Sequence, residues 1–436
     1  MESIIKLLIV VTFLPLITKR SRITKDIEQP DQAILEFTAW EKKIGIYRRK
    51  VVIKATRTGM RGVFAKEHIN PDEELINIPL RAIITQEYPT NDPIIKKARR
   101  YLREIDLLVV TVHQEIHNPN TLFKPYFDLW PESVDNFPLF FNQSQFDLLQ
   151  GTSVINFIHI FIDEMNHRYE NIRRVLPELN NFTLTDFYKY SMLCISRCLM
   201  LNINGRKQTV FVPSYDMINT FPYTNQELHT VGTAYKDRHP GEPYVTLRAR
   251  KEIKEGDEVH IYYRGDYTNT EYLIHYGFMF KEVSDVSLQI RLKLEGEYIE
   301  AKKQIFKHLP DAYVLNDSVL VNMKNASSNA SYWSLVNTAQ ILEVNDENEL
   351  NDILDYVKNE RSVAFAREDT RAAMNRLMNA INNLLSNYPT TIEEDEELML
   401  DYYPHSTTHS LIQIRLDEKR TLKKILKQII NNGDVY

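Results

Sequence analysis

The segment Phe211-Val-Pro-Ser-Tyr-Asp-Met-Ile-Asn-Thr220 carries the densest chemistry of the 436-residue sequence, together with Gly256-Asp-Glu-Val-His-Ile-Tyr-Tyr263 and His275-Tyr-Gly-Phe278. Its apolar start predicts a strand, and the part from Pro213 onward predicts an irregular segment that contains Asp216 and Asn219. Backbone and amide groups in such a segment are free to bind a ligand. Several tyrosines follow up to Tyr276, and about half of them are expected to serve only in strands and core.

Short strand signals precede this segment at residues 51–55, 63–65 and 74–79, with turns at 58–62 and 70–72. Residues 65–75 are echoed in register by residues 249–259: each run has Ala, then Ile four positions later, a turn, then Glu and an aliphatic residue. One echo does not make a repeat protein. It predicts two similar hairpins in one small β-fold, separated by a long insert.

The insert, at about residues 91–201, has helical character, and a short entry helix is predicted at 34–43. Insert helices are predicted at 98–113, at 144–149 with Ser144 as the cap, at 154–175, and at 185–200 after the cap signal beginning at Thr183. His159, Asp163 and His167 share one helix face at a spacing that suits metal ligands. Nothing else completes such a site, so a polar helix face is favoured and no metal is predicted.

Beyond Phe278 the composition changes to a strand-like stretch at 289–298 and helices from residue 341 onward. The acidic run after Thr391 fits a capping box, in which carboxylates stabilise the first turn of a helix. The terminal helix is amphipathic, with Leu422, Ile425 and Ile429 on one side and lysines opposite. Such a helix can bind a membrane surface. Packing against the other C-terminal helices is favoured.

Composition excludes some functions. The formal charge of -6 argues against coating of nucleic acid, and no nucleic acid partner is expected. Cys194 and Cys198 lie four apart in a helical pattern, where a disulfide is geometrically poor. The apolar run at residues 7–17 resembles a signal peptide core, but it lacks a cleavage pattern and is too short to span a bilayer. A cytoplasmic protein, also allowed in the nucleus, is expected, and secretion through residues 1–20 is the minority alternative.

Serine hydrolase, Walker, dinucleotide and zinc-protease motifs are missing from the sequence. The residues present resemble the SET-domain protein methyltransferases, in the branch that contains the actin-histidine and Rubisco lysine methyltransferases. The resemblance runs from Trp40 to Ile430. Its motifs are Lys124-Pro-Tyr126, Leu129-Trp-Pro131, Pro213-Ser-Tyr-Asp-Met-Ile-Asn219, Gly256-Asp-Glu-Val259, Asn269-Thr-Glu271, Tyr276-Gly-Phe278, Thr390-Thr-Ile-Glu-Glu-Asp395 and Arg415-Leu-Asp-Glu-Lys419. Each motif is weak alone, and their shared order is the specific signal.

The resemblance implies an α+β fold: a split β-rich SET core with a helical insert, followed by a mainly helical C-terminal substrate-binding domain. The expected division is an N-terminal extension at 1–33, the SET domain at 34–280 and the C-terminal domain at 281–436. The implied activity is S-adenosylmethionine-dependent methylation of a protein nitrogen by direct displacement, with a histidine of actin as the leading target. A monomer without stable membrane insertion is expected.

By the same resemblance, Tyr263 is the catalytic hydroxyl beside the reacting nitrogen, with Tyr262 as the fallback. Leu199, Tyr215 and Tyr262 would line the substrate site. The residues that would hold the cofactor are Glu87, Arg197, Asp216, Met217, Asn219, Thr220, Tyr276, Gly277 and Phe278.

The sequence departs from the family at three positions. Thr220 stands where the family has a histidine, Phe64 stands where it has an arginine that contacts the cofactor, and the turn up to Gly62 is longer. Loss of an arginine on a carboxylate costs on the order of 1.5 to 3 kcal/mol. The apolar Leu199 suits a lysine stem at least as well as an imidazole. Lysine methylation and a catalytically silent binding protein therefore remain alternatives.

Overall fold

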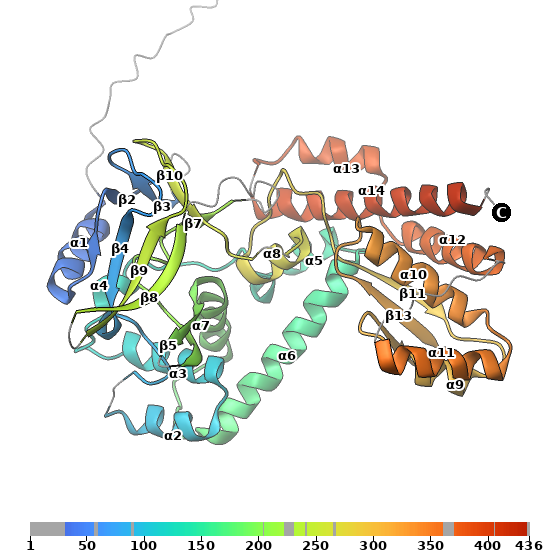
Figure 1. Ribbon diagram of the computed structural model, residues 1–436, viewed down its shortest axis with the longest axis horizontal. Helices are drawn as coiled ribbons and strands as arrows, with labels where there is room; N and C mark the ends of the chain where they lie inside the picture. The colour runs from blue at the N-terminus through green and yellow to red at the C-terminus, as the bar shows by residue number, and fades with distance from the viewer. Residues whose placement is uncertain are drawn as a thin grey trace, which may run out of the picture.

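The computed structural model describes residues 31–55, 60–88, 91–203, 205–221, 231–239, 242–264, 267–360, 370–404 and 406–433. The predicted N-terminal apolar run and the start of the turn at 58–62 lie outside these residues. The buried apolar side chains form two clusters, one around the N-terminal β-sheets and helical insert and one around the C-terminal helices. Figure 1 shows the two parts side by side, with the long helix α6 (Ser153–Val175) running between them.

Two four-stranded sheets make up the β-rich core in the described residues. The first has the order β1 (Tyr47–Arg48), β4 (Glu74–Pro79), β9 (Glu242–Ala249), β8 (Val231–His239). The second has the order β2 (Val51–Ala55), β3 (Arg61–Ala65), β10 (Glu258–Ile261), β7 (Asn219–Thr220). The strands predicted at 51–55 and 74–79 are confirmed, and that at 63–65 is the end of β3.

The two segments that echo each other in sequence pair with each other in space. Ile69 and Ile253, which are equivalent in the echo, exchange both backbone hydrogen bonds at 3.0 Å. The pairing extends from Ala65, whose N–H donates to Asp257, to Glu73, whose carbonyl accepts from Ala249. The relation is therefore a local pseudo-twofold centred on the two isoleucines. The expectation of two hairpins is wrong: each segment connects a strand of one sheet to a strand of the other, β3 to β4 and β9 to β10, and the two connections pair with each other.

The insert is helical, as predicted, but three local expectations are wrong. The single helix expected at 98–113 is two helices, α2 (Pro93–Tyr101) and α3 (Glu104–Ile116), because Leu102 and Arg103 adopt extended backbone angles. Helix α5 (Gln143–Leu148) is capped by Asn142 and not by Ser144. Helix α7 (Leu184–Arg197), capped by Thr183 as expected, ends before residue 200.

Residues 199 and 200 belong to a hairpin, β5 (Leu199–Ile203) with β6 (Arg206–Val210). The remaining helices of this part are α1 (Gln32–Ile44), which confirms the entry helix, α4 (Lys124–Phe127) and α8 (Asn269–Tyr276), with single 3-10 turns at Leu80–Ala82 and Pro138–Phe140.

The C-terminal part is mainly helical but also contains an antiparallel sheet in the order β11 (Leu288–Lys293), β13 (Ser318–Met323), β12 (Ala312–Leu315). The strand expected at 289–298 thus ends at Lys293. The helices are α9 (Ile299–Phe306), α10 (Asn329–Leu342), α11 (Glu347–Glu360), α12 (Arg371–Ser386), α13 (Ile392–Met399) and α14 (Thr407–Gly433).

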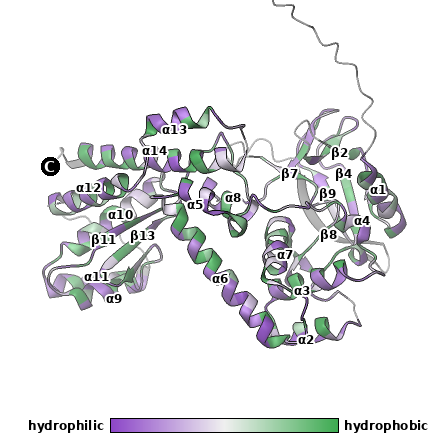
Figure 2. Cartoon of the chain, turned by 180° about the vertical axis from the view of Figure 1, so that it is seen from behind, coloured by the Kyte–Doolittle hydropathy of each residue, from purple (hydrophilic) through white to green (hydrophobic). Residues whose placement is uncertain are grey.

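The terminal helix α14 is a packed helix. Leu422, Ile425 and Ile429 are buried in the C-terminal cluster, as expected for its apolar face. Figure 2 shows hydrophilic and hydrophobic residues alternating along α14 and α6, the pattern of amphipathic helices. Among the described residues, no helix combines the length and apolarity needed to cross a bilayer.

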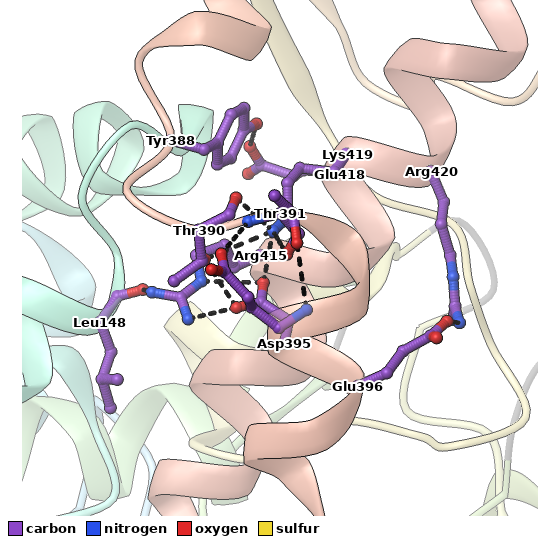
Figure 3. A network of polar contacts seen from close by, with 11 residues as sticks. Leu148, Tyr388, Thr390, Thr391, Asp395, Glu396, Arg415, Glu418, Lys419 and Arg420 are labelled. Carbon is purple, nitrogen blue, oxygen red and sulfur yellow. Dashed lines mark hydrogen bonds and ion pairs between the residues drawn. The ribbon is translucent and has the colours of Figure 1, made fainter.

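A buried polar network joins α14 to the insert, and Figure 3 shows it from close by. The Glu418 carboxylate accepts hydrogen bonds from the backbone N–H groups of Ser153 (2.7 Å) and Val154 (3.0 Å), at the start of α6. Arg415 donates to the carbonyl of Leu148 (3.0 Å) and forms an ion pair with Asp395. The C-terminal part is therefore bonded directly to the helix that also enters the N-terminal core.

Candidate active site

Parallel pairing of β7 with β10 brings the quoted segment to the tyrosines. Asn219 pairs with His260 and Thr220 with Ile261, so the chain leaves β10 beside residues 218–220. Asn219 was expected in an irregular segment, and the two-residue strand corrects this. The Tyr263 N–H donates to Thr220 Oγ1 (3.3 Å), and the Tyr263 hydroxyl donates to the Ile218 carbonyl (3.0 Å). Both ends of Tyr263 are therefore held by this segment.

The predicted cofactor turn at residues 276–278 lies against Tyr263. The rings of Tyr263 and Tyr276 are stacked, with centroids 5.0 Å apart and an interplanar angle of 25°. Gly277 ends α8 with a φ of 72°, and Asn136 Nδ2 donates to its carbonyl (3.0 Å). A Cβ at Gly277 would lie 2.4 Å from that nitrogen, so the close contact requires glycine.

Asp216 is the buried charge of the site. Its side chain is fully buried, and one oxygen, Oδ2, accepts from the Tyr126 hydroxyl (2.7 Å) and from Arg197 Nη1 (3.2 Å). Its other oxygen, Oδ1, is buried and has no hydrogen-bond partner among the described residues. Burial raises the pKa of Asp216, and the Arg197 guanidinium opposes that shift. A donor brought by a ligand would satisfy Oδ1.

Asn219 binds protein atoms on one side. Its Nδ2 donates to the Arg61 carbonyl (3.0 Å) and to Glu258 Oε1 (2.7 Å). Burial alone would raise the pKa of Glu258, but hydrogen bonds from His260 and Asn219 hold it below the usual value. A Cβ at Gly62 would lie 2.3 Å from Glu258 Oε1, so the small residue there makes room for this carboxylate.

The phenols of the site stay neutral at physiological pH. Burial raises the pKa of Tyr276 and that of Tyr215 to about 12, and it raises the pKa of Tyr263 further. A neutral hydroxyl can donate one hydrogen bond and accept others, but it is no general base. These tyrosines can therefore orient and desolvate a substrate without taking its proton.

The structure brings most of the predicted residues together. Met217 is buried beside Asp216, and the Phe278 ring contacts that of Tyr276 at 6.0 Å. Tyr262 and Tyr215 are half-buried. Glu87 stands apart from these contacts: its side chain is 56% exposed and pairs with Arg206 on the β5–β6 hairpin at 3.7 Å. Leu199, half-buried, begins that same hairpin.

Sequence reasoning missed three residues that build the site: Tyr126, Asn136 and Glu258. Tyr126 lies in the quoted Lys124-Pro-Tyr126 motif, but nothing local indicates that its hydroxyl meets Asp216, 90 positions away. Phe64, at the position of the missing arginine, carries the Lys54 ammonium over its ring at 4.4 Å. Lys54, on the neighbouring strand β2, therefore places a cation over the side chain at this position.

The described residues contain no group of three or more His, Cys, Asp or Glu side chains arranged to hold a metal ion. His159 instead packs its ring against Phe146, and His167 pairs with Glu170. The small sheets, the parallel β7–β10 contact and the buried Asp216–Tyr263 centre are joined to a mainly helical C-terminal part, so the protein is an α+β protein with two cores.

Comparison with known proteins specifies the class. The SET domain model matches residues 60–264, and the Rubisco LSMT substrate-binding model matches residues 295–422. The chain is thus a SET-domain protein that carries a Rubisco LSMT-type substrate-binding domain. It is 23% identical over 398 residues to the actin-histidine N-methyltransferases of Homo sapiens and Canis lupus familiaris, covering 86% of this chain. The match spans 64% of the human protein's length and 65% of the dog protein's.

Solved structures agree on the fold. The SET domain of LSMT bound to methyllysine and AdoHcy superposes with a TM-score of 0.75 at 18% identity, covering 93% of each chain. Rubisco LSMT bound to AdoMet gives 0.73 at 17% identity, covering 92% of each chain. At these identities the likeness establishes the fold, and the chemistry rests on the site.

Proposed function

We propose that this protein is an S-adenosylmethionine-dependent protein N-methyltransferase whose target is a histidine of actin. The observation that carries the proposal is the position of Tyr263, held by Ile218 and Thr220 and stacked on Tyr276 beside the buried Asp216. The names of the relatives and the cofactor in the superposed structures support it. The boundaries at 33 and 280 and action in the cytoplasm, as a monomer, belong to the same proposal.

The residues present fit the cofactor. Arg197 is a cation on the edge of the site, with a side chain 19% exposed, and it suits the carboxylate of an amino acid moiety. The unpartnered Oδ1 of Asp216 suits a donor such as an ammonium or hydroxyl group. Met217, Asn219, Thr220 and residues 276–278 would form the walls, and Glu87 would contribute from the hairpin side. When bound, S-adenosylmethionine supplies an electrophilic methyl group for direct displacement by a nitrogen.

The protein's own contribution is positioning and exclusion of water. Because the Tyr263 hydroxyl donates its proton to the Ile218 carbonyl, its oxygen remains available only as an acceptor. It can accept an N–H of the target group and so orient the reacting nitrogen. The half-buried Tyr215, Tyr262 and Leu199 would surround the target side chain and keep water away. A histidine needs little help with its proton, because its pKa is near 6.5.

The same observation favours lysine as the second candidate target. A neutral amine carries N–H groups on the reacting nitrogen itself, and an acceptor such as Tyr263 Oη suits them directly. Lysine must first lose a proton, at a cost of about 4.6 kcal/mol at pH 7. The two targets are separated by mass spectrometry of methylated actin, which assigns the methyl group to histidine or lysine.

The function is tested by methylation of purified actin by wild type, Tyr263→Phe and Asn219→Ala. We expect Tyr263→Phe to lower kcat roughly 100-fold, because the nitrogen loses its orienting acceptor. Asn219→Ala removes a hydrogen bond to the half-buried Glu258 and is expected to weaken cofactor binding, measured by calorimetry. Tyr169→Phe is the control, since Tyr169 also donates to a carbonyl, that of Phe182, in the insert.

Three outcomes contradict the proposal. Unchanged turnover in both site variants would exclude Tyr263 and Asn219 from the chemistry. Wild-type protein that binds the cofactor but methylates no residue of actin would point to another protein substrate or to a silent binding protein. Protein that fails to bind the cofactor at all excludes the whole class.

A further inference from the structure

An exposed aromatic loop connects α13 to α14. We define it as residues 400–404, Leu-Asp-Tyr-Tyr-Pro. Leu400 is 85% exposed, Tyr403 is 88% exposed and Tyr402 is 39% exposed. Large apolar side chains this exposed within four consecutive positions are uncommon on a monomer and mark interaction sites.

The aromatic loop is an ordered structure. The backbone N–H groups of Leu400, Asp401 and Tyr402 each donate to the carbonyl three residues earlier, so α13 continues into tight turns. Its base is fixed by the buried Asp395, which forms ion pairs with Arg415 and Lys419 of α14 (Figure 3). A rigid support lowers the entropic cost of ordering these side chains when a partner binds.

A small cavity of about 20 Å³ lies between the aromatic loop and the residues that follow the candidate cofactor turn. It is lined by Met279, Phe280 and Lys281, which directly follow the 276–278 turn, and by Pro404, His409, Ser410 and Gln413. The Phe280 ring contacts those of Phe278 (5.3 Å) and Tyr272 (4.9 Å). Figure 1 shows the start of α14 above α8, on the side of the C-terminal part that faces the sheets. The aromatic loop and the cavity therefore lie beside residues that contact the 276–278 turn.

Helix α13 and the aromatic loop carry mainly negative charge, whereas Lys281 is a cation on the wall of the cavity. No Lys or Arg occurs between Arg376 and Arg415 in the sequence. The exposed carboxylates on or beside α13 are Glu393, Glu394, Glu396, Glu397 and Asp401. Asp395 is neutralised by its two cations, and Glu396 pairs with Arg420. This charge disfavours an anionic lipid surface and suits a segment in which a basic residue lies near an apolar one.

We propose that the aromatic loop and the adjoining cavity form a docking site for the segment of the protein substrate that flanks the methylated residue. An apolar side chain of that segment packs on Tyr403 and Leu400 beside the cavity, and a basic residue of the segment lies near Glu397 and Asp401. The inference rests on the proposed function, because it takes the occupant to be the substrate of that site. Its consequence is that selection of the substrate depends on residues beside the target as well as on the target itself.

The test compares Leu400→Ala/Tyr403→Ala with the control Leu122→Ala/Tyr101→Ala, whose side chains in the insert are 64% and 65% exposed. Purified monomeric actin is the probe. Steady-state methylation gives KM and kcat, biolayer interferometry gives the actin Kd, and calorimetry gives the cofactor Kd. We expect the loop variant to raise KM and the actin Kd about tenfold, with kcat and the cofactor Kd unchanged, because exposed tyrosines often act as interface anchors. The control is expected to behave as wild type.

A charge variant adds an independent measurement. Glu397→Gln/Asp401→Asn is expected to raise KM about threefold at low salt and to weaken its dependence on NaCl, because screened charges lose their attraction. Wild type is expected to show a KM that rises with NaCl. A KM that is independent of both salt and these two residues would contradict the charge argument.

The remaining outcomes separate this proposal from the proposed function. Normal methylation of actin with an unchanged KM in the loop variant overturns the docking site and leaves the function intact. Wild type that does not bind the cofactor overturns the proposed function. Docking is still supported in that case if wild type binds actin and the loop variant does not. Three further results overturn the inference. The first is wild type that binds no actin. The others are binding to phosphatidylcholine–phosphatidylserine vesicles, or self-association in ultracentrifugation, that is lost when Tyr403 is replaced.

Discussion

Asp216 shows how one residue can be both anchored and available. Its Oδ2 is bound by Tyr126 and Arg197, whereas Oδ1 has no partner in the described part of the chain. A buried carboxylate with one unsatisfied oxygen is unfavourable in the free protein, since the group keeps part of its desolvation cost. A ligand donor at Oδ1 would recover that free energy on binding.

At this scale we predict that Tyr126→Phe lowers the free energy of unfolding by about 1.5 to 3 kcal/mol, the range for a hydrogen bond to a charged group. The ring contacts with Trp40 and Trp130 remain, so the core stays filled. The variant should also weaken cofactor binding, because Asp216 is held less firmly. Urea unfolding and calorimetry measure the two effects.

Tyr388→Phe is the matched control for this prediction. Tyr388 is also a buried tyrosine that donates to a buried carboxylate, Glu418, at 2.8 Å in the C-terminal part. Tyr388→Phe should lower the free energy of unfolding by a similar amount and leave the cofactor affinity unchanged. Equal cofactor affinities for wild type and Tyr126→Phe would show that Tyr126 has only a structural role.

The departures noted in the sequence have local explanations. Thr220 Oγ1 accepts the Tyr263 N–H, so the residue in the place of the family's histidine helps to hold the catalytic candidate. Lys54 over the Phe64 ring brings a cation near the position of the missing arginine. Neither role was visible in the sequence, because each depends on a contact between segments.

At the scale of elements, the two echoed segments are alike in structure as well as in sequence. The echo of residues 65–75 in 249–259 predicted two similar hairpins, whereas the structure has two similar connections between the sheets, which pair with each other around Ile69 and Ile253. The turn residues Asp72 and Gly256 occupy equivalent positions, and both have left-handed φ angles, 63° and 86°. The two equivalent turns therefore have the same backbone conformation but different residues.

Substitutions at these two turns are expected to have opposite effects on stability. Asp72→Gly should stabilise the protein by up to about 1 kcal/mol, because glycine adopts a positive φ without a Cβ penalty. Gly256→Asp should destabilise the protein by a similar amount. A Cβ there meets no atom within 4 Å, so the cost comes only from the positive φ angle. Thermal unfolding checks both. Shifts of the same sign would contradict the equivalence of the two turns.

The elements that were predicted wrongly have different causes. The apolar period continues across Leu102 and Arg103 because α2 and α3 both turn apolar residues to the core, so periodicity does not reveal the break. The end of α7 did have a signal. Asn204-Gly205 is a strong hairpin turn, and it predicts strands on both sides of it.

At the scale of the whole molecule, α6 is common to both cores. Its buried Val154 and Ile158 belong to the C-terminal cluster, and Met165 and Ile172 belong to the N-terminal one. Its N-cap Thr152 makes no side-chain capping bond, and Glu418 of α14 accepts from the first N–H groups instead. The start of the shared helix is thus capped by the C-terminal part.

This junction gives the stability a pH dependence. Burial raises the pKa of Glu418 to about 7 from a usual value of 4.5, so the folded protein binds this proton more tightly than the unfolded chain. Its contribution to the free energy of unfolding therefore falls as pH rises from about 4.5 to about 7, by on the order of 3 kcal/mol, and is constant above that range. Asp417, with a pKa raised to about 6 by burial, acts in the same direction.

Urea unfolding of wild type and Glu418→Gln at pH 5 and pH 8 measures this effect. We expect the loss of stability between the two pH values to be smaller in Glu418→Gln, with a remainder from Asp417. Glu396→Gln, which changes an exposed carboxylate of the same region, should keep the wild-type difference. An identical pH dependence in all three proteins would show that Glu418 titrates as it does in the unfolded chain.

The sequence by itself determined the local features: the capping boxes at Thr183 and Thr391, the amphipathic helices, the likeness of residues 65–75 to residues 249–259 and the motif order that indicates the SET class. Only the tertiary structure decided which distant groups meet. Tyr126 reaches Asp216 across 90 positions, Asn136 reaches Gly277 across 141, and Glu418 reaches Ser153 across 265. Caps and periodicity act within a few residues, whereas a buried polar group is satisfied by whatever partner the packed core brings to it.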